Sequence, residues 1–144
     1  MPKTLDDILN AALDRYVWTS PESDEHMVRV SLVSRDAMFV EMIGRVSDDA
    51  VPTLRQGLRE FARQGATNLY WDVSRIEHFE SGIRDTSLDF VREFSDQLGE
   101  FNVCTVSAPW GVKMGVRLAD MLMKGKITNF SDRASFISKL GHAQ

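Results

Sequence analysis

The feature that most constrains the fold is a regular alternation of apolar and amphipathic segments that begins near residue 27. Two short runs, 27–34 and 37–44, are separated by a polar pair and are typical of an antiparallel hairpin. From there to about residue 140, segments with helical periodicity alternate with short apolar segments. Such alternation predicts right-handed crossovers and parallel strand pairing. We therefore expect an α/β fold with a mixed, mostly parallel sheet of about five strands and helices packed against it.

The expected elements after the hairpin follow from apolar spacing and from glycine and proline positions. Helices are expected at 47–65, 87–99, 109–125 and 131–141, and strands at 67–73, 101–108 and 126–130. Pro52 must lie in the first turn of its helix, which favours Asp48 or Asp49 over Ser47 as the cap. In the helix 109–125, helical spacing predicts an inward face made of Met114, Leu118, Met121 and Leu122. Met123 is expected to lie outside this face. The two glycines of GVKMG, residues 111–115, indicate close packing of this helix on the sheet.

The first 26 residues look like an extension appended to the main domain. Apolar residues at helical spacing predict a helix over 4–16, with Thr4 as its N-cap. The stretch 19–26 is polar and acidic and is typical of a linker. We expect residues 1–26 to form an N-terminal helix and linker and residues 27–141 to form the main domain. A short helix needs packing to persist, so it lies on its own domain, on a partner, or on a second copy in a homodimer.

Composition excludes several classes of function. The formal net charge is −4 and the two signs are mixed, which argues against a nucleic-acid partner because that requires a clustered basic face. No apolar run reaches the roughly 18 residues of a membrane span, and the acidic N-terminus is not typical of a secretory signal. The single cysteine, Cys104, excludes an internal disulfide and fits a reducing compartment. We expect a cytoplasmic protein.

Residues that carry metal or catalytic chemistry lack the spacing that such chemistry requires. His26, His78 and His142 are far apart, without the spacing of a ligand pair, so no metal site is expected. No phosphate-binding glycine loop is present and no cofactor is expected. Cys104 lies in an apolar strand and is expected to be a buried, unreactive thiol. The nearby carboxylates, Asp72, Glu77, Glu80 and Asp85, lie in a polar segment that gives no sign of the unequal pKa values that acid–base catalysis needs.

The segment VSRIEHFESGIRDTS, residues 73–87, concentrates polar groups between an apolar run and an amphipathic one. Ser81 precedes a glycine and a helical run, which is typical of a helix N-cap, and Thr86 is a second candidate cap. A phosphate on Ser81 would lie near the positive end of the helix dipole, but Glu80 and Asp85 would repel it. The residues favour a cap and leave phosphorylation of Ser81 as the alternative.

Most of the chain, residues 38–140, resembles a STAS domain, the class of sulfate-transporter tails and bacterial anti-sigma factor antagonists. The similarity includes MFVEMIGRVSDDAVPTLRQGLREFARQGATNLYWDVS, whose Asp72-Val73-Ser74 matches the family's D-[LV]-S strand ending. HFESGI stands where the family has F-x-D-S-[ST]-G-L, and FNVCTVSAPWGVKMGVRLADMLMKGKITNFSDRASFISKL resembles its closing strand–helix–strand–helix. The resemblance implies the fold of that family.

The resemblance also concerns the residue that the family's switch proteins phosphorylate, the first serine of that motif. The segment is one residue shorter here. Alignment from Asp72 places Ser81 at the acceptor position, whereas alignment from Gly82 places Glu80 there as a fixed negative charge. Arg84 stands where the family has a second glycine.

The resemblance implies a non-enzymatic regulatory module that docks a protein partner, of kinase or anti-sigma factor type, through the loop 74–82 and the start of the next helix. Ser81 is the phosphorylation candidate, and the expected partner-binding residues are Asp72, Ser74, His78, Glu80, Ser81, Gly82 and Arg84. The alternative is a small-molecule or lipid-binding domain of the same fold, with an apolar pocket between helices and sheet. Three tryptophans are candidates to line that pocket: Trp18, Trp71 and Trp110.

Overall fold

The computed structural model describes residues 3–144, whose six strands pair in chain order. The strands are β1 (Asp14–Ser20), β2 (Ser23–Leu32), β3 (Ala37–Val46), β4 (Asn68–Phe79), β5 (Glu100–Cys104) and β6 (Ile127–Phe130). β1, β2 and β3 pair antiparallel, and β3, β4, β5 and β6 pair parallel. The predicted mixed, mostly parallel α/β fold and the predicted hairpin around residues 35–36 are therefore confirmed.

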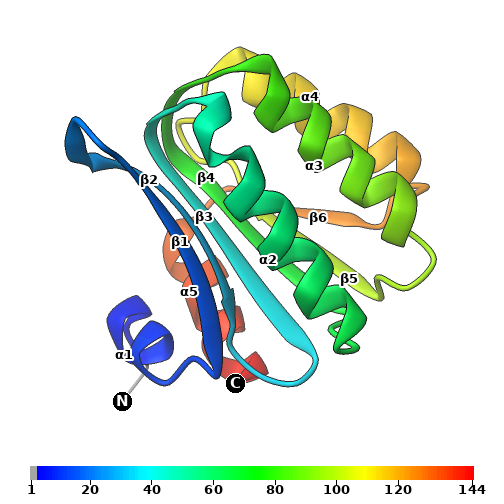
Figure 1. Ribbon diagram of the computed structural model, residues 1–144. Coiled ribbons are helices and arrows are strands. Elements are labelled where there is room, and N and C mark those ends of the chain that lie inside the picture. The colour runs from blue at the N-terminus through cyan, green and yellow to red at the C-terminus, as the bar shows by residue number, and fades with distance from the viewer. Residues whose placement is uncertain (1–2) are drawn as a thin grey trace.

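Helices cover both faces of the sheet (Figure 1). The chain contains α1 (Leu5–Asn10), the 3-10 turn η1 (Asp48–Ala50), α2 (Val51–Arg63), α3 (Ser81–Phe94), α4 (Trp110–Leu122) and α5 (Arg133–Ala143). α2, α3 and α4 lie on one face, and α1 and α5 lie on the other. No helix in the described part of the chain is long and apolar enough to cross a membrane.

Strand residues alternate between two separate hydrophobic cores because successive side chains point to opposite faces of a sheet. On β3 and β4, Val40 and Trp71 belong to the larger core under α2, α3 and α4. Their neighbours Phe39 and Tyr70 belong to a smaller core, which also contains residues of α1 and α5: Ile8, Leu9, Phe136 and Leu140. One sequence of alternating residues thus builds two cores of different size.

The predictions of a helix over 4–16 and a linker over 19–26 are wrong beyond residue 10. The helix is only α1, closed at its start by a capping box between Thr4 and Asp7, and residues 14–20 form β1. The acidic stretch is the turn of a hairpin and the first half of β2, so it belongs to the same sheet. Tyr16 and Trp18 alternate inward along β1 and pack against the larger core, a strand pattern that the helical spacing concealed. The dimerisation considered for this segment stays a prediction.

Three further boundary predictions are wrong. Neither Asp48 nor Asp49 is the cap near Pro52: the Ser47 hydroxyl accepts a hydrogen bond from the Asp49 amide at the start of η1, and α2 then begins without a side-chain cap. β4 continues to Phe79 instead of ending at residue 73, and α3 begins at Ser81, the earlier of the two candidate caps, rather than at residue 87. The segment expected as a loop over 74–82 is therefore mostly strand and helix.

The predicted inward face of α4 is correct at Leu122, which packs against the larger core, and wrong at Leu118, Met121 and Met123. Met123 is 2% exposed, whereas Met121 is 76% exposed and Leu118 45% exposed. Val112 and Ala119 face the core, so the helix is rotated relative to the expected phase. Trp110 is 76% exposed and is absent from the lining of the pocket between α3 and α4.

Candidate functional site

The predicted site residues separate into two groups on β4 because this strand is long. Asp72 and Ser74 lie in its middle, while Glu80, Ser81, Gly82 and Arg84 lie after its end. The six residue steps of extended chain from Ser74 to Glu80 span about 20 Å. The seven predicted residues therefore do not form one site.

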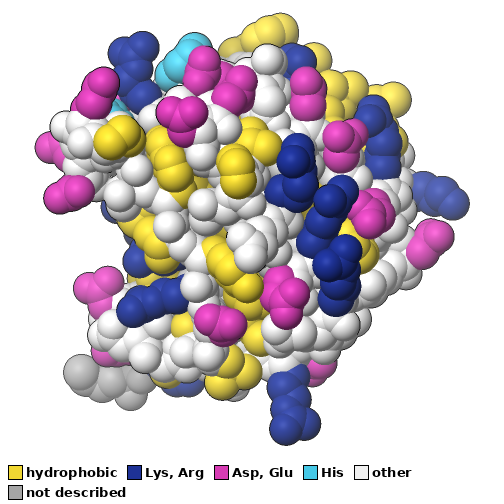
Figure 2. All heavy atoms as spheres, viewed as in Figure 1, with side chains coloured by type: hydrophobic (Ala, Val, Ile, Leu, Met, Phe, Trp, Pro, Cys, Tyr) yellow, Lys and Arg dark blue, Asp and Glu magenta, His cyan; other side chains and the backbone are white. Residues whose placement is uncertain are grey.

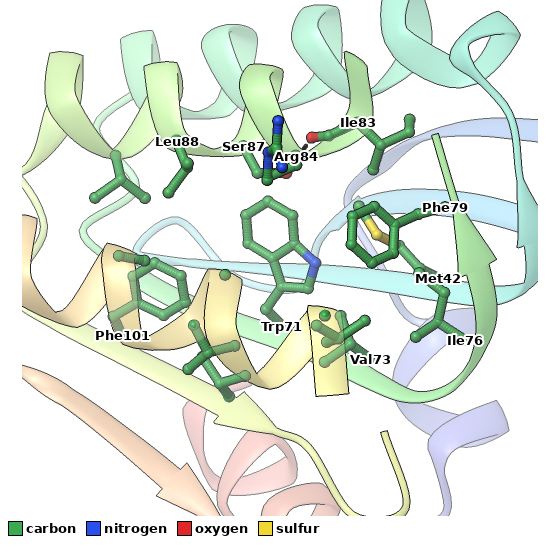
Figure 3. A pocket seen from close by; sticks show the side chains of 17 residues that line it. Met42, Trp71, Val73, Ile76, Phe79, Ile83, Arg84, Ser87, Leu88 and Phe101 are labelled. Carbon is green, nitrogen blue, oxygen red and sulfur yellow. Dashed lines mark hydrogen bonds between the residues drawn. The ribbon is translucent and has the colours of Figure 1, made fainter. Parts of the chain in front are cut away.

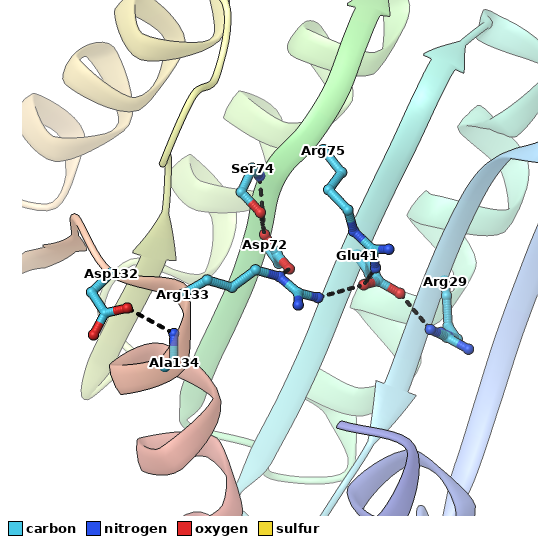
Figure 4. A network of polar contacts seen from close by, with 8 residues as sticks. All are labelled: Arg29, Glu41, Asp72, Ser74, Arg75, Asp132, Arg133 and Ala134. Atoms are coloured by element: carbon cyan, nitrogen blue, oxygen red, sulfur yellow. Dashed lines mark hydrogen bonds and ion pairs between the residues drawn. The ribbon is translucent and has the colours of Figure 1, made fainter. Parts of the chain in front are cut away.

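Asp72 and Ser74 belong to a buried ion cluster on the face of the sheet that carries α1 and α5 (Figure 4). Asp72 is 1% exposed, and its Oδ1 accepts hydrogen bonds from the amide and hydroxyl of Ser74. Its Oδ2 accepts a hydrogen bond from Arg133 Nε at 3.0 Å. These contacts place Asp72 inside the fold, where it cannot meet a docking partner directly.

A second carboxylate, Glu41, extends this group into what we call the arginine–carboxylate cluster: Arg29, Glu41, Asp72, Arg75 and Arg133. Glu41 is fully buried and accepts hydrogen bonds from Arg29 and from Arg75, the latter at 2.6 Å. Arg133 Nη2 lies 3.5 Å from Glu41 Oε2. Two carboxylates thus face three guanidinium groups. Sequence reasoning missed Glu41, although a glutamate inside the apolar run AMFVEMIG was the signal.

Strand register explains why these side chains meet. Arg29, Glu41 and Asp72 are direct partners across β2, β3 and β4, and Cys104 continues the same row on β5. Burial raises the pKa of the Cys104 thiol, and Asp72 adds to the effect. The buried thiol with a raised pKa is a poor nucleophile. Among the described residues no group of histidine, cysteine and carboxylate side chains is arranged to hold a metal.

The second group of predicted residues lies where β4 ends and α3 begins. Ser81 is the first residue of α3 and is exposed, and Glu80 occupies the N-cap position without a side-chain capping bond. Instead, Glu80 Oε1 accepts a hydrogen bond from the Asp48 amide at 2.8 Å. A Cβ on Gly82 would lie directly against the Asp48 carboxylate, so glycine allows that carboxylate to approach the first turn of α3.

We call this surface the acidic edge: Asp48, Asp49, Glu80, Ser81, Gly82 and Asp85. Its four carboxylate residues are exposed, and acidic side chains cluster along this end of the molecule (Figure 2). Arg84 also lies here and contacts Asp85 Oδ1 at 3.3 Å. His78 is the second-last residue of β4, pairs with Arg45 of β3, and is exposed. Asp48 and Asp49 were predicted as helix caps and not as members of this surface.

A pocket adjoins the acidic edge between α3, α4 and the sheet (Figure 3). Trp71 lines it, together with Phe79 at the end of β4. Of the three tryptophans expected to line such a pocket, only Trp71 is among the residues that line this one. Trp18, on β1, packs elsewhere against the larger core.

Comparison with protein families and with curated proteins finds no match. Solved structures do match. The unphosphorylated form of the anti-sigma factor antagonist SpoIIAA is 22% identical and has a TM-score of 0.53, with 60% of this chain and 79% of that chain covered. The phosphorylated form of SpoIIAA, a Bacillus cell fate determinant, is 15% identical with a TM-score of 0.56, covering 75% and 95%.

A third match is an uncharacterised protein of the DUF3478 family from Shewanella loihica PV-4, which has a SpoIIAA-like fold. It is 12% identical with a TM-score of 0.52, covering 88% of this chain and 93% of that chain. Identities this low establish the fold and no more. The order of elements, the mixed sheet and these matches agree, and the chain has a SpoIIAA-like fold.

Proposed function

We propose that this chain is a non-enzymatic regulatory module that docks a protein partner with a basic surface through the acidic edge. The observation that carries the proposal is the crowding of four exposed carboxylate residues around one exposed serine at the start of α3. Opposite charges on two surfaces speed association and select partners. The likeness to SpoIIAA, which is known in phosphorylated and unphosphorylated forms, supports a regulatory role but does not identify the partner.

The acidic edge carries its charge without modification. Glu80 is held by the Asp48 amide, and the Asp48 carboxylate lies against Gly82. A phosphate on Ser81 would gain from the helix dipole and would be opposed by these carboxylates. We therefore propose that fixed charge provides docking and that phosphorylation of Ser81, where a kinase supplies it, changes its strength. A kinase or an anti-sigma factor is the proposed class of partner, and the cytoplasm is its proposed location.

The test compares charge-neutral variants that keep the shape of the edge. Glu80→Gln retains an oxygen that accepts from the Asp48 amide, and Asp48→Asn retains the packing against Gly82. Proteins captured from a lysate of the source organism are compared for the wild type, the double variant, and Asp89→Asn as a control further along α3. Asp89 is exposed and pairs with Arg92 at 3.2 Å.

We expect one partner to be retained by the wild type and the control and lost by the double variant. The affinity of the purified partner should fall up to about fivefold for each carboxylate removed. Added salt should reduce the difference in affinity between the wild type and the double variant. Equal capture by all three forms would contradict the proposal. Mass spectrometry after incubation with kinases and ATP, with Ser81→Ala and Ser81→Asp compared in binding, tests the phosphorylation step separately.

A further inference from the structure

The pocket between α3 and α4 has an almost wholly apolar lining (Figure 3). Its volume is about 90 Å³, and it opens to the surface between the two helices. Trp71 and Phe79 project into it from β4, and the other lining residues are aliphatic side chains, one more phenylalanine and two glycines, apart from Arg84 and Ser87. The Ser87 hydroxyl donates to the Ile83 carbonyl at 2.8 Å, so its proton is already used. Arg84 is the one charged residue of the lining.

Two glycines of α4 keep this pocket open. A Cβ on Gly115 would meet no atom within 4 Å, and one on Gly111 would meet only the Phe79 ring, at 3.6 Å and 3.8 Å. By contrast, a Cβ on Gly57 of α2 would lie 2.8 Å from the Val30 side chain. Close helix–sheet packing therefore explains Gly57 and does not explain Gly115. The sequence-based expectation that GVKMG marks close packing is wrong at Gly115. Glycine inside a helix lowers its stability relative to alanine, and here that cost leaves an accessible space.

Arg84 has hydrogen-bonding capacity that the protein does not use well. Its two contacts go to the same oxygen of Asp85, both at 3.3 Å, which is long for a charged pair. A guanidinium group has five N–H donors, and the Arg84 side chain is 48% exposed. An anionic group arriving at the mouth of the pocket can therefore bind the guanidinium without breaking a strong internal bond.

We propose that this pocket binds a small carboxylic acid, whose apolar tail enters between α3 and α4 and whose carboxylate binds Arg84. An apolar cavity with a single cation at its mouth matches an amphiphile with one negative charge in both shape and charge. The enclosed space is smaller than the ~150 Å³ cavity that holds benzene in an engineered protein core, so it takes the end of a tail. This proposal does not depend on docking at the acidic edge.

The first experiment titrates the full chain with straight-chain carboxylates from butanoate to decanoate, followed by calorimetry. We expect saturable binding of one ligand per chain. Affinity should rise up to about fourfold for each added methylene, because each buried methylene adds a hydrophobic increment, and it should stop rising when the pocket is full. The matching alcohols should bind about tenfold more weakly because they lack the charge that pairs with Arg84. Absence of binding up to the solubility limit would overturn the proposal.

Variants then identify the site. Gly115→Leu fills the pocket mouth and should abolish binding of acids and alcohols alike, while its thermal unfolding shows that the fold is retained. Arg84→Gln should weaken the acids about tenfold and leave the alcohols unchanged. Arg92→Gln, which removes an exposed arginine elsewhere on α3, should change neither. Equal affinity of the wild type and Gly115→Leu, or equal loss for acids in the Arg84 and Arg92 variants, would overturn the assignment.

Discussion

The two faces of the sheet are built by the same strands and yet are stabilised differently. The face under α2, α3 and α4 is a large hydrophobic core, and none of these helices begins with a capping hydrogen bond from its own N-cap side chain. The face under α1 and α5 has a smaller core. There the helices begin with capping bonds from Thr4 and Asp132, and the arginine–carboxylate cluster occupies the sheet beyond them. Where less apolar area is buried, polar contacts determine the local structure.

This difference between the two faces shows that the position of a carboxylate in a strand can be fixed by its contacts as firmly as that of a core residue. Glu41 is fully buried, and a buried charge requires partners because its transfer from water is costly. Its partners come from three different elements: Arg29 of β2, Arg75 of β4 and Arg133 of α5. The cluster therefore links the hairpin, the parallel strands and the last helix.

The largest expected effect comes from removing the charge of Glu41. Glu41→Gln keeps the shape of the side chain and leaves three arginines facing only Asp72. Breaking a buried charge pair by removing one partner typically costs about 3–5 kcal/mol. We expect a loss of this size in the free energy of unfolding, measured by urea denaturation.

The matched control is Glu93→Gln, whose pair with Arg59 is 3.4 Å long and about half exposed on both sides. Exposed pairs contribute less than about 1 kcal/mol, so this variant should unfold close to the wild type. If both variants unfold at the same urea concentration, the polar face is not held by its charges and the comparison between the faces fails.

The sequence allowed the order of most helices and strands to be predicted, and the polar face hardly at all. Apolar periodicity gave the order of α2, α3, α4 and α5 because helical spacing reports one buried side. The cluster joins residues that are far apart in the chain, up to 104 positions between Arg29 and Arg133, and only strand register brings them together. Tyr16 was misassigned to a helix over 4–16 because a short apolar pattern can fit a strand as well as a helix.

The residues of the candidate site were predicted from the polar composition of the segment, but their secondary structure was predicted incorrectly. Polar residues 74–79 were expected to form a loop, yet pairing with β3 keeps them extended up to Phe79. A polar sequence remains a strand when a neighbouring strand supplies its hydrogen bonds and one side can face solvent. Glu80 and Ser81 therefore lie at the start of a helix, as expected, whereas Asp72 and Ser74 lie in the middle of β4, away from them.

Effects of intermediate size on stability are expected for two glycine variants, which test whether the larger core is close-packed throughout. Gly57→Ala places a Cβ 2.8 Å from the Val30 side chain, and overpacking of this kind costs about 1–3 kcal/mol. Gly115→Ala meets open space and should stabilise the protein by about 0.5–1 kcal/mol, since alanine favours the helix. Thermal unfolding of the two variants should shift in opposite directions. A destabilised Gly115→Ala would mean that α4 packs as closely as α2.

The smallest expected effect concerns the charge of the helix caps on the polar face. Hydrogen bonds from the Ser135 hydroxyl and the Ala134 amide lower the pKa of Asp132, and the Thr4 amide and hydroxyl lower the pKa of Asp7. A carboxyl whose pKa is lower when folded stabilises the protein above its unfolded pKa, near 3.8, and loses this contribution as the pH falls through the folded pKa. Acid should therefore weaken α1 and α5 by protonating Asp7 of the α1 capping box and Asp132, the N-cap of α5.

Replacing the caps by amides separates charge from shape. Asparagine is also a good N-cap, so Asp132→Asn removes the charge and retains an acceptor for the Ala134 amide. The wild type should melt slightly above this variant at pH 6, and the two melting temperatures should converge as the pH falls from 3.8 through the lowered pKa of folded Asp132. Asp96→Asn, at an exposed position away from α1 and α5, should show no such convergence. A difference that persists in acid would mean that Asp132 stabilises α5 through geometry alone, and charge would then matter on the polar face only within the arginine–carboxylate cluster.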